Sequence, residues 1–282
     1  MNVYVVDAIN ELSNEAFEKA LGYVEVARRE RIMKFHFMTD KKRSLMGTLL
    51  SGYAISKALG IAPGEVEYGK NEYGKPFVVS SNEHGESFAM GEPDVQFNIS
   101  HSGNYVALAI GNDPVGIDVQ EHKDGMDNIA ERFFSKEEKE ALAAAGAVGG
   151  EKTGGPIGEK TGSSGGEKTG GPVGDKASGS GDETTDLRRE LFYEMWSLKE
   201  AYIKAIGKGL SQPLDEFGVI NKNGEYKLFI KGKESTDYHF AKYDLEGYSL
   251  CVCSTDSDFP KDYVKVPCKE ILDYYERFKN DM

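Results

Sequence analysis

The sequence predicts an α+β fold in two halves, and three observations lead to this prediction. Segments in which apolar residues recur at helical spacing are interleaved with short alternating segments, without the regular order of a doubly wound parallel sheet. The 282 residues are enough for one large domain or for two smaller ones. Residues 146–182 contain 14 of the 33 glycines and separate two stretches of ordinary composition.

The elements before the glycine-rich stretch follow from these spacings. Helical spacing covers residues 41–59 and returns at 127–145. The segments that predict strands are MNVYVVDAIN at the start of the chain, 95–99, 105–110 and 115–119. The last two flank the turn signal Asn112-Asp113-Pro114, so we expect them to form an antiparallel strand–turn–strand unit.

After the glycine-rich stretch, residues 187–206 predict a long helix, followed by short strands to about residue 254 and a short amphipathic helix, KEILDYYERFK. The core stripe expected on the long helix consists of Leu191, Met195, Leu198, Tyr202 and Ile206. The predicted organisation has four parts, which are an N-terminal half at 1–120, a connecting helix at 121–145, a loop at 146–182 and a C-terminal half at 183–282.

The loop at 146–182 contains an internal repeat of period 16, in which GGEKTGGPIGEK returns as GGEKTGGPVGDK. It has no aromatic residue and few large apolar ones, so it buries too little surface to offset the entropy of ordering, and we predict that it is disordered. Two interpretations stay open, namely a tether or docking segment, and a tolerated expansion of a surface loop.

Composition excludes several classes of protein. The formal charge of −13 argues against a nucleic-acid-binding protein, which needs a basic surface. There is no apolar run of about 18 residues, so we expect no membrane span, and with no signal-like N-terminus we expect a cytoplasmic protein. The three cysteines fit neither a disulfide framework nor a zinc site, and Cys251 and Cys253 are expected on one buried strand face.

Two segments place carboxylates on rigid elements. On the strand VGIDVQ, Asp118 and Gln120 share the face opposite the core, where Asp118 is either a ligand for a hard metal or a solvated surface group. On the long helix, Trp196, Glu200 and Lys204 form one file. The pair of Glu200 and Lys204 is either functional or an ordinary stabilising i,i+4 ion pair.

Two other segments could bind phosphate. In FNISHSG, Ser100 and His101 lie at a strand end, where hydroxyl, imidazole and backbone N–H groups suit an anion, although a lone histidine there also fits a structural role. Residues 28–43 hold seven cations and two acids in an acidic chain, which indicates either a phosphate site or a solvated helix face.

The order of these segments is more specific than any one of them. FNISHSG, GIDV, FFSKEE and WSLKEAYIKAIGKGL, with RRERIMKF and EYGKP earlier in the chain, resemble the motifs of the Sfp-type 4′-phosphopantetheinyl transferases. The resemblance covers about 1–145 and 183–255. It implies two similar α/β halves about a pseudo-twofold axis, a monomer, and a Mg²⁺-dependent transfer of 4′-phosphopantetheine from coenzyme A to a serine of an apo carrier protein of fatty-acid, peptide or polyketide synthesis, with release of adenosine 3′,5′-bisphosphate.

The resemblance also implies roles for individual residues. Asp118 and Glu200 match metal carboxylates, Glu200 matches the base that takes the proton of the serine, and Lys204 matches the lysine that holds the phosphates. The residues that match contacts to coenzyme A are Arg28, Arg31, Arg43, Ser44, Lys75, Ser100, His101 and Lys204. Trp196 is expected to support Glu200.

Gln120 departs from the motif, which usually carries a third carboxylate at this position. An amide oxygen or a water could replace that ligand, so we expect weaker Mg²⁺ binding and retained activity. The departure also leaves open a catalytically weak homologue that binds coenzyme A or a carrier protein without efficient turnover.

Overall fold

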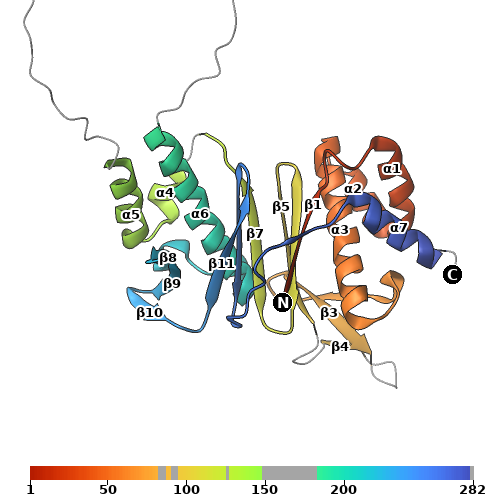
Figure 1. Cartoon of the computed structure of the whole chain (residues 1–282). Coiled ribbons are helices and arrows are strands. Elements are labelled where there is room, and N and C mark those ends of the chain that lie inside the picture. The colour runs from red at the N-terminus through yellow and green to blue at the C-terminus, as the bar shows by residue number, and fades with distance from the viewer. Residues whose placement is uncertain (82–86, 90–94, 125–126, 148–182, 280–282) are drawn as a thin grey trace, which may run out of the picture.

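The computed structural model describes most of the chain, and the fold is α+β (Figure 1). The described residues are 1–81, 87–89, 95–124, 127–147 and 183–279. Of the predicted disordered loop at 146–182, residues 148–182 lie outside this description. No helix in the described ranges is long and apolar enough to cross a membrane.

The first half is built on a four-stranded sheet against which one long helix packs. The strands, in sheet order, are β13 (Val264–Lys265), β1 (Asn2–Asp7), β6 (Tyr105–Gly111) and β5 (Gln96–Ser102). The long helix α3 runs over Met38–Leu59 and buries Leu45, Met46 and Leu49 in the main core. The helices beside it are α1 (Asn14–Ala20), α2 (Val26–Met33) and α7 (Cys268–Lys279). The predicted first strand and the helix at 41–59 are confirmed.

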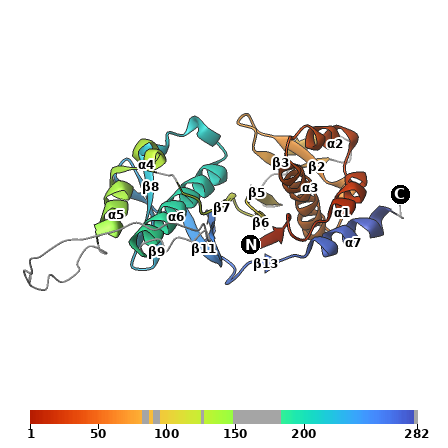
Figure 2. The ribbon, with the colours of Figure 1, turned by 90° about the horizontal axis from the view of Figure 1, so that it is seen from above.

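The second half places one long helix over a three-stranded sheet (Figure 2). The strands, in sheet order, are β11 (His239–Leu245), β12 (Tyr248–Ser254) and β7 (Val115–Glu121). The helix α6 (Glu183–Ile206) contains the predicted long helix, and Met195, Leu198 and Tyr202 of the predicted stripe are buried. Cys251 and Cys253 are buried free thiols on β12, as expected.

Two smaller antiparallel sheets and short turns complete the described chain. One contains β2 (Glu67–Lys70), β3 (Pro76–Ser81) and β4 (Ser87–Ala89), and the other β8 (Phe217–Lys222), β9 (Glu225–Ile230) and β10 (Lys233–Ser235). The 3₁₀ turns are η1 (Leu21–Tyr23), η2 (Pro63–Glu65), η3 (Gly209–Ser211) and η4 (Leu214–Glu216).

The segment predicted as one helix at 127–145 forms two helices, α4 (Asp127–Phe133) and α5 (Lys136–Ala147). The break falls at Ser135, whose Oγ accepts from the Glu138 N–H at 3.3 Å while Glu138 Oε2 accepts from the Ser135 N–H at 2.8 Å. This reciprocal pair is a capping box, which satisfies the first N–H groups of α5 and starts a new helix.

The two halves meet where β5 lies beside β7. Asn98 Oδ1 accepts from the Ile117 N–H, and Ser102 Oγ accepts from the Glu121 N–H, both at 3.0 Å. The expected antiparallel pairing of 105–110 with 115–119 is therefore wrong. β6 pairs with β1 and β5, whereas β7 pairs with β12, 127 to 139 residues further along the chain.

The end of the chain returns to the first half. β13 pairs in parallel with β1, and α7 lies against α3, where the Tyr275 hydroxyl donates to Leu49 O at 3.1 Å. Two elements therefore lie in the half opposite to the predicted one. β7 was predicted in the N-terminal half but belongs to the sheet of the second half, and α7 was predicted in the C-terminal half but packs in the first half. The cluster of polar side chains described next lies where β7 runs beside β5.

Candidate active site

A cluster of polar side chains lies at the junction of β5, β7 and α6. Asp118, whose side chain is buried, accepts through Oδ1 from Lys204 Nζ at 2.6 Å and from Ser100 Oγ at 2.9 Å. Lys204 Nζ also donates to Ser100 Oγ at 3.0 Å and to Ile117 O at 3.1 Å. Three residues that are far apart in the sequence therefore form one hydrogen-bonded group.

Gly116 explains how α6 reaches this strand. A Cβ at this position would lie 2.0 Å from Ala201 O and 2.4 Å from Ala205 N, which are backbone atoms of α6. Only a glycine lets the helix backbone approach the strand so closely. Because Glu200 and Lys204 flank the contact point on the helix, they are held over the face of β7 that carries Asp118.

The cluster contains an unsatisfied oxygen and a second carboxyl group. Asp118 Oδ2 is buried and has no hydrogen-bond partner. Burial raises the pKa of Glu200, and the Asp118 charge raises it further, while Lys204 opposes both effects. The unpartnered oxygen of Asp118 lacks a positive partner, and the two carboxyl groups repel one another. A divalent cation bound between them would remove both unfavourable effects. Gln120, half-buried, lies on the same strand face as Asp118.

The described residues contain no group of three or more His, Cys, Asp and Glu side chains arranged to hold a metal. Two carboxylates and one amide are fewer ligands than a calcium cage needs. They match Mg²⁺, which keeps several waters and takes most of its other ligands from substrate phosphates. The chemistry of this donor set, two carboxyl groups and an amide oxygen, is therefore compatible with Mg²⁺ bound together with a phosphate ester.

A second group of residues lies between α2 and α3. Arg28 Nε donates to Thr48 Oγ1 at 2.8 Å, and its NH2 group contacts both Ser44 O and Ser44 Oγ at 3.4 Å. Burial lowers the pKa of Arg28, and the charge of Arg31 lowers it further. Two neighbouring guanidinium groups that repel one another are a suitable site for a dianionic phosphate.

His101 points to the opposite face of β5 from Ser100, since neighbouring residues of a strand alternate. Its ring is exposed, but the surrounding protein lowers its pKa by desolvation, and the charge of Arg43 adds to this effect. The imidazole is therefore biased toward its neutral form at neutral pH, in which it both donates and accepts a hydrogen bond.

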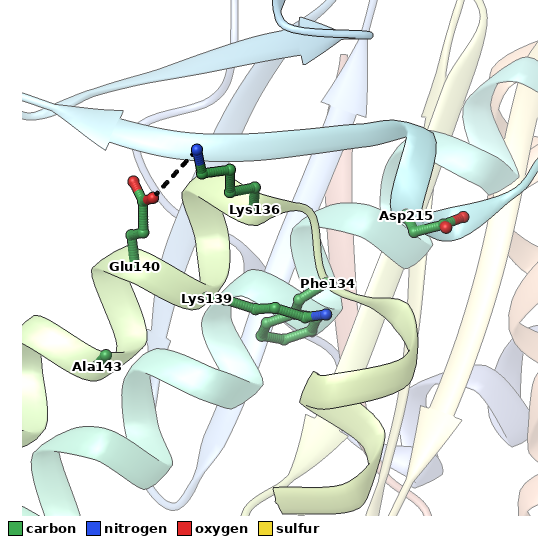
Figure 3. Close-up of a pocket in the computed structure, with 6 residues that line it drawn as sticks. All are labelled: Phe134, Lys136, Lys139, Glu140, Ala143 and Asp215. Carbon is green, nitrogen blue, oxygen red and sulfur yellow. Dashed lines mark ion pairs between the residues drawn. The ribbon is translucent and has the colours of Figure 1, made fainter.

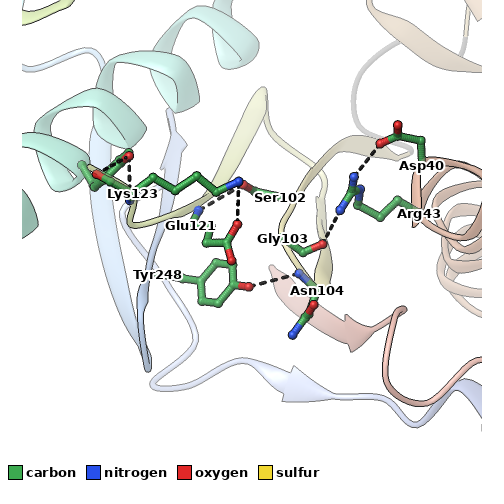
Figure 4. A network of polar contacts seen from close by, with 9 residues as sticks. Asp40, Arg43, Ser102, Gly103, Asn104, Glu121, Lys123 and Tyr248 are labelled. Atoms are coloured by element: carbon green, nitrogen blue, oxygen red, sulfur yellow. Dashed lines mark hydrogen bonds and ion pairs between the residues drawn. The ribbon is translucent and has the colours of Figure 1, made fainter. Parts of the chain in front are cut away.

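Arg43 supports the turn after β5 (Figure 4). Its guanidinium group donates to Gly103 O and pairs with Asp40. On the other side of the same turn, the Tyr248 hydroxyl accepts from the Asn104 N–H at 3.0 Å. These contacts fix the turn that follows Ser100 and His101. Glu121 pairs with Lys123 at 2.8 Å.

Lys75 lies at a contact between the halves. Its Nζ donates to Val115 O at 3.1 Å and to Ala205 O at 3.0 Å, which join the start of β7 to the end of α6. Asn71 of the same turn donates from Nδ2 to Gly207 O at 2.9 Å. In this structure the EYGKP turn therefore holds the C-terminal end of α6, next to Lys204.

Sequence reasoning missed a buried ion pair beside Glu200. Lys199 Nζ and Glu138 Oε2 are 2.6 Å apart and both side chains are fully buried. Lys199 also donates to Phe217 O, and Glu138 Oε1 accepts from the Val219 N–H at 3.1 Å. The pair joins α5, α6 and β8. The Ser135–Glu138 capping motif was a sequence signal for the start of α5, but it does not reveal Lys199 as the partner of Glu138.

Trp196 packs in an aromatic group, with its ring 6.0 Å from that of Phe133 and 6.4 Å from that of Phe192.

A depression lies beside α5 (Figure 3), and its lining residues are Phe134, Lys136, Lys139, Glu140, Ala143 and Asp215. Its ion pair, Lys136 with Glu140 at 3.8 Å, is solvent-exposed, and none of its lining residues belongs to the Asp118 cluster. The candidate site is therefore the cluster at the junction of the halves.

Comparison with known proteins identifies the family of this chain. Residues 11–112 match the family model described as 4′-phosphopantetheinyl transferase, N-terminal, and residues 176–253 match that of the 4′-phosphopantetheinyl transferase superfamily. A solved structure, the holo-[acyl-carrier-protein] synthase (AcpS) of Thermotoga maritima, is 18% identical, with a TM-score of 0.32, over 51% of this chain and 64% of that chain.

Two curated relatives cover nearly the whole chain. The 4′-phosphopantetheinyl transferase Sfp of Bacillus subtilis (strain 168) is 31% identical over 96% of this chain and 100% of its own length. A second 4′-phosphopantetheinyl transferase of Bacillus subtilis is 31% identical over 92% of this chain and 94% of its own length. With the motifs on β5, β7 and α6 assembled into one cluster, the chain belongs to the Sfp-type 4′-phosphopantetheinyl transferases and is an enzyme of that class.

Proposed function

We propose that the protein transfers 4′-phosphopantetheine from coenzyme A to a serine hydroxyl of an apo acyl, peptidyl or aryl carrier protein, and releases adenosine 3′,5′-bisphosphate. The observation that carries this proposal is the cluster of Asp118, Lys204 and Ser100 under Glu200, which combines cationic and carboxylate groups at the junction of the halves. Breaking the pyrophosphate of coenzyme A builds negative charge on its oxygens, and fixed cations stabilise that charge.

Mg²⁺ would be held by Asp118, Glu200 and Gln120, because the unpartnered Asp118 Oδ2 and the repulsion between the two carboxyl groups favour a cation there. When bound, Mg²⁺ supplies a Lewis acid that neutralises charge on the pyrophosphate. Gln120 contributes a neutral oxygen where a carboxylate would add a charge, so we expect a higher Mg²⁺ requirement than with Glu at this position.

The protein groups have distinct tasks in this scheme. The Lys204 ammonium lies at the cluster centre and contacts the phosphate oxygens, with Ser100 as a hydroxyl donor beside it. Glu200 takes the proton of the incoming serine, directly or through a water, because its raised pKa makes the carboxylate a stronger base. The serine oxygen then attacks the β-phosphorus of coenzyme A, and the bond to the bridging oxygen breaks.

The other end of coenzyme A needs a site for its 3′-phosphate. Arg28 and Arg31, with Ser44 beside Arg28, offer guanidinium and hydroxyl donors to that dianion. We propose that the imidazole of His101 adds a further hydrogen bond to coenzyme A. We propose that Arg43 acts by holding the turn after Ser100, and that Lys75 lies near the adenine while it anchors the end of α6.

Several broader features belong to the same proposal. Each half has one long helix, α3 or α6, packed on a sheet that contains three antiparallel strands, which supports a pseudo-twofold relation between them. The site then lies between halves of one chain, so we propose a monomer. A cytoplasmic location and a role in fatty-acid, peptide or polyketide synthesis follow from the availability of coenzyme A and apo carriers.

The experiment that tests the proposal is transfer itself. The protein is incubated with coenzyme A, Mg²⁺ and purified apo acyl and peptidyl carrier proteins, and the carriers are weighed by mass spectrometry. We expect the mass of one phosphopantetheine to be added. Binding of coenzyme A or carrier without any added mass on several carriers would instead support the weak homologue, for which Gln120 is the one sequence feature.

A further inference from the structure

The apolar–basic patch comprises the exposed apolar side chains of Val26, Met33, Phe35, Phe37 and Met38 with the cations around them. These five side chains are exposed by 66%, 43%, 45%, 64% and 38%, and they account for half of the large apolar residues that the described chain exposes. Every residue from Met33 to Thr39 is exposed. Val26 and Met33 are seven residues apart on α2, so they share one helix face. Large apolar side chains gathered in this way mark an interaction surface.

The charge of the same segment is opposite to that of the whole protein. Residues 25–43 contain seven cations and three acids, a net charge of +4 in a chain of −13. Arg31 and Lys34 are exposed, and Lys41 and Lys42 are half-buried at the start of α3. The negative charge of the rest of the protein repels an acidic partner, whereas the positive charge of this segment attracts it. An acidic partner is therefore expected to bind at this segment.

The patch lies next to the active site. Met38 begins α3, and Arg43 follows within about 7.5 Å along the helix axis, at a rise of 1.5 Å per residue. Arg43 donates to Gly103 O in the turn that follows Ser100, while Arg28 and Ser44 of the proposed phosphate site lie between α2 and α3. A protein seated on the patch is therefore at the rim of the site that must receive its serine.

We propose that the apolar–basic patch is the docking surface for the carrier protein, and that the carrier it fits is acidic with apolar side chains near its serine. This inference rests on the proposed function. Aromatic residues, methionine and arginine are enriched in protein–protein interfaces, whose rims are polar. The apolar groups give affinity by burial, and the cations orient the acidic partner during approach.

Two substitution pairs separate the two contributions. In the first, Phe35→Ser and Phe37→Ser remove aromatic rings from the exposed surface, and we expect the KM for an apo acyl carrier protein to rise about tenfold or more. In the second, Lys34→Glu and Lys41→Glu reverse two charges, and we expect a similar rise that shrinks at 0.5 M salt. In both, kcat at saturating carrier and the KM for coenzyme A should stay within twofold of wild type. Val264→Ser, at a 50% exposed position on β13, is the matched control.

Wild-type transfer to the carrier is measured first, since its absence would reject the proposed function and not the patch alone. If wild type transfers and both pairs keep the wild-type carrier KM, the docking proposal is overturned. A fall in kcat or a loss of coenzyme A affinity with unchanged carrier KM would also overturn it, because the segment would then serve the cofactor site. If the carrier KM does not change, two other assays identify a different occupant. Binding to vesicles that contain anionic lipid would assign the patch to a membrane. Self-association in sedimentation that the Phe35→Ser and Phe37→Ser pair abolishes would assign it to a second copy of the chain.

Discussion

The buried pair of Lys199 and Glu138 allows a quantitative prediction. Lys199→Met removes the ammonium and leaves the fully buried Glu138 carboxyl group without its cation. Removing one partner of a buried pair typically costs about 3–5 kcal/mol, because the remaining charge is uncompensated. At about 2–4 °C per kcal/mol for a protein of this size, the melting temperature should fall by about 6–20 °C.

The reasoning is tested by a double-mutant cycle read by urea unfolding. Glu138→Leu alone should cost a similar free energy, since Lys199 is then unpaired. The double variant should be considerably more stable than the sum of the two single losses predicts, because neither buried charge remains. The matched control is the solvent-exposed pair of Lys269 and Asp273, 2.5 Å apart, whose removal should cost no more than about 0.5 kcal/mol. Single losses below about 1 kcal/mol, or strict additivity, would refute the argument.

Three further predictions address the site. Gly116→Ala should lower kcat more than tenfold and cost about 1–3 kcal/mol of unfolding free energy, because its Cβ would overlap the backbone at Ala201 and Ala205. Wild-type kinetics in this variant would contradict the close packing of α6 on β7. Gln120→Glu should lower the Mg²⁺ concentration for half-maximal transfer, and an unchanged Mg²⁺ titration would remove Gln120 from the metal site. Burial lowers the pKa of Lys75 to about 8, against 10.5 in the unfolded chain, so between these pH values the unfolded state binds more protons. Lys75 should therefore contribute a rise in unfolding free energy of about 3 kcal/mol between pH 8 and pH 10.5, and Lys75→Met should lack this contribution in unfolding experiments.

The local elements of this fold could be predicted from the sequence because periodicity reports which face of a segment is buried. The helices over 41–59 and 187–206 and the strand holding Asp118 were found in this way. Periodicity does not report the partner of a strand. β7 was assigned to its neighbour in the chain, but its ladder is with β12, and the contact with β5 runs through Asn98 and Ser102 side chains.

The candidate residues of the site were chosen from the order of the motifs, because each motif is short and unspecific alone whereas their succession along the chain is specific. The structure brings Ser100, Asp118 and Lys204 into one hydrogen-bonded cluster that no spacing rule would have joined. Lys199 could not be predicted from its type, since a lysine on a helix is usually exposed. Its burial depends on Glu138, 61 residues away, and therefore only on tertiary structure.

The central claim is that the cluster under Glu200 performs phosphopantetheine transfer. The most direct test compares Glu200→Ala with Glu190→Ala. For each variant, the rate of transfer to an apo carrier is measured from the increase in mass of the carrier. Glu190 is an exposed acid on the same helix. We expect Glu200→Ala to lower the rate by at least about 10²-fold, as loss of a general base does, and Glu190→Ala to leave it within twofold. Transfer by Glu200→Ala at the wild-type rate would contradict the account.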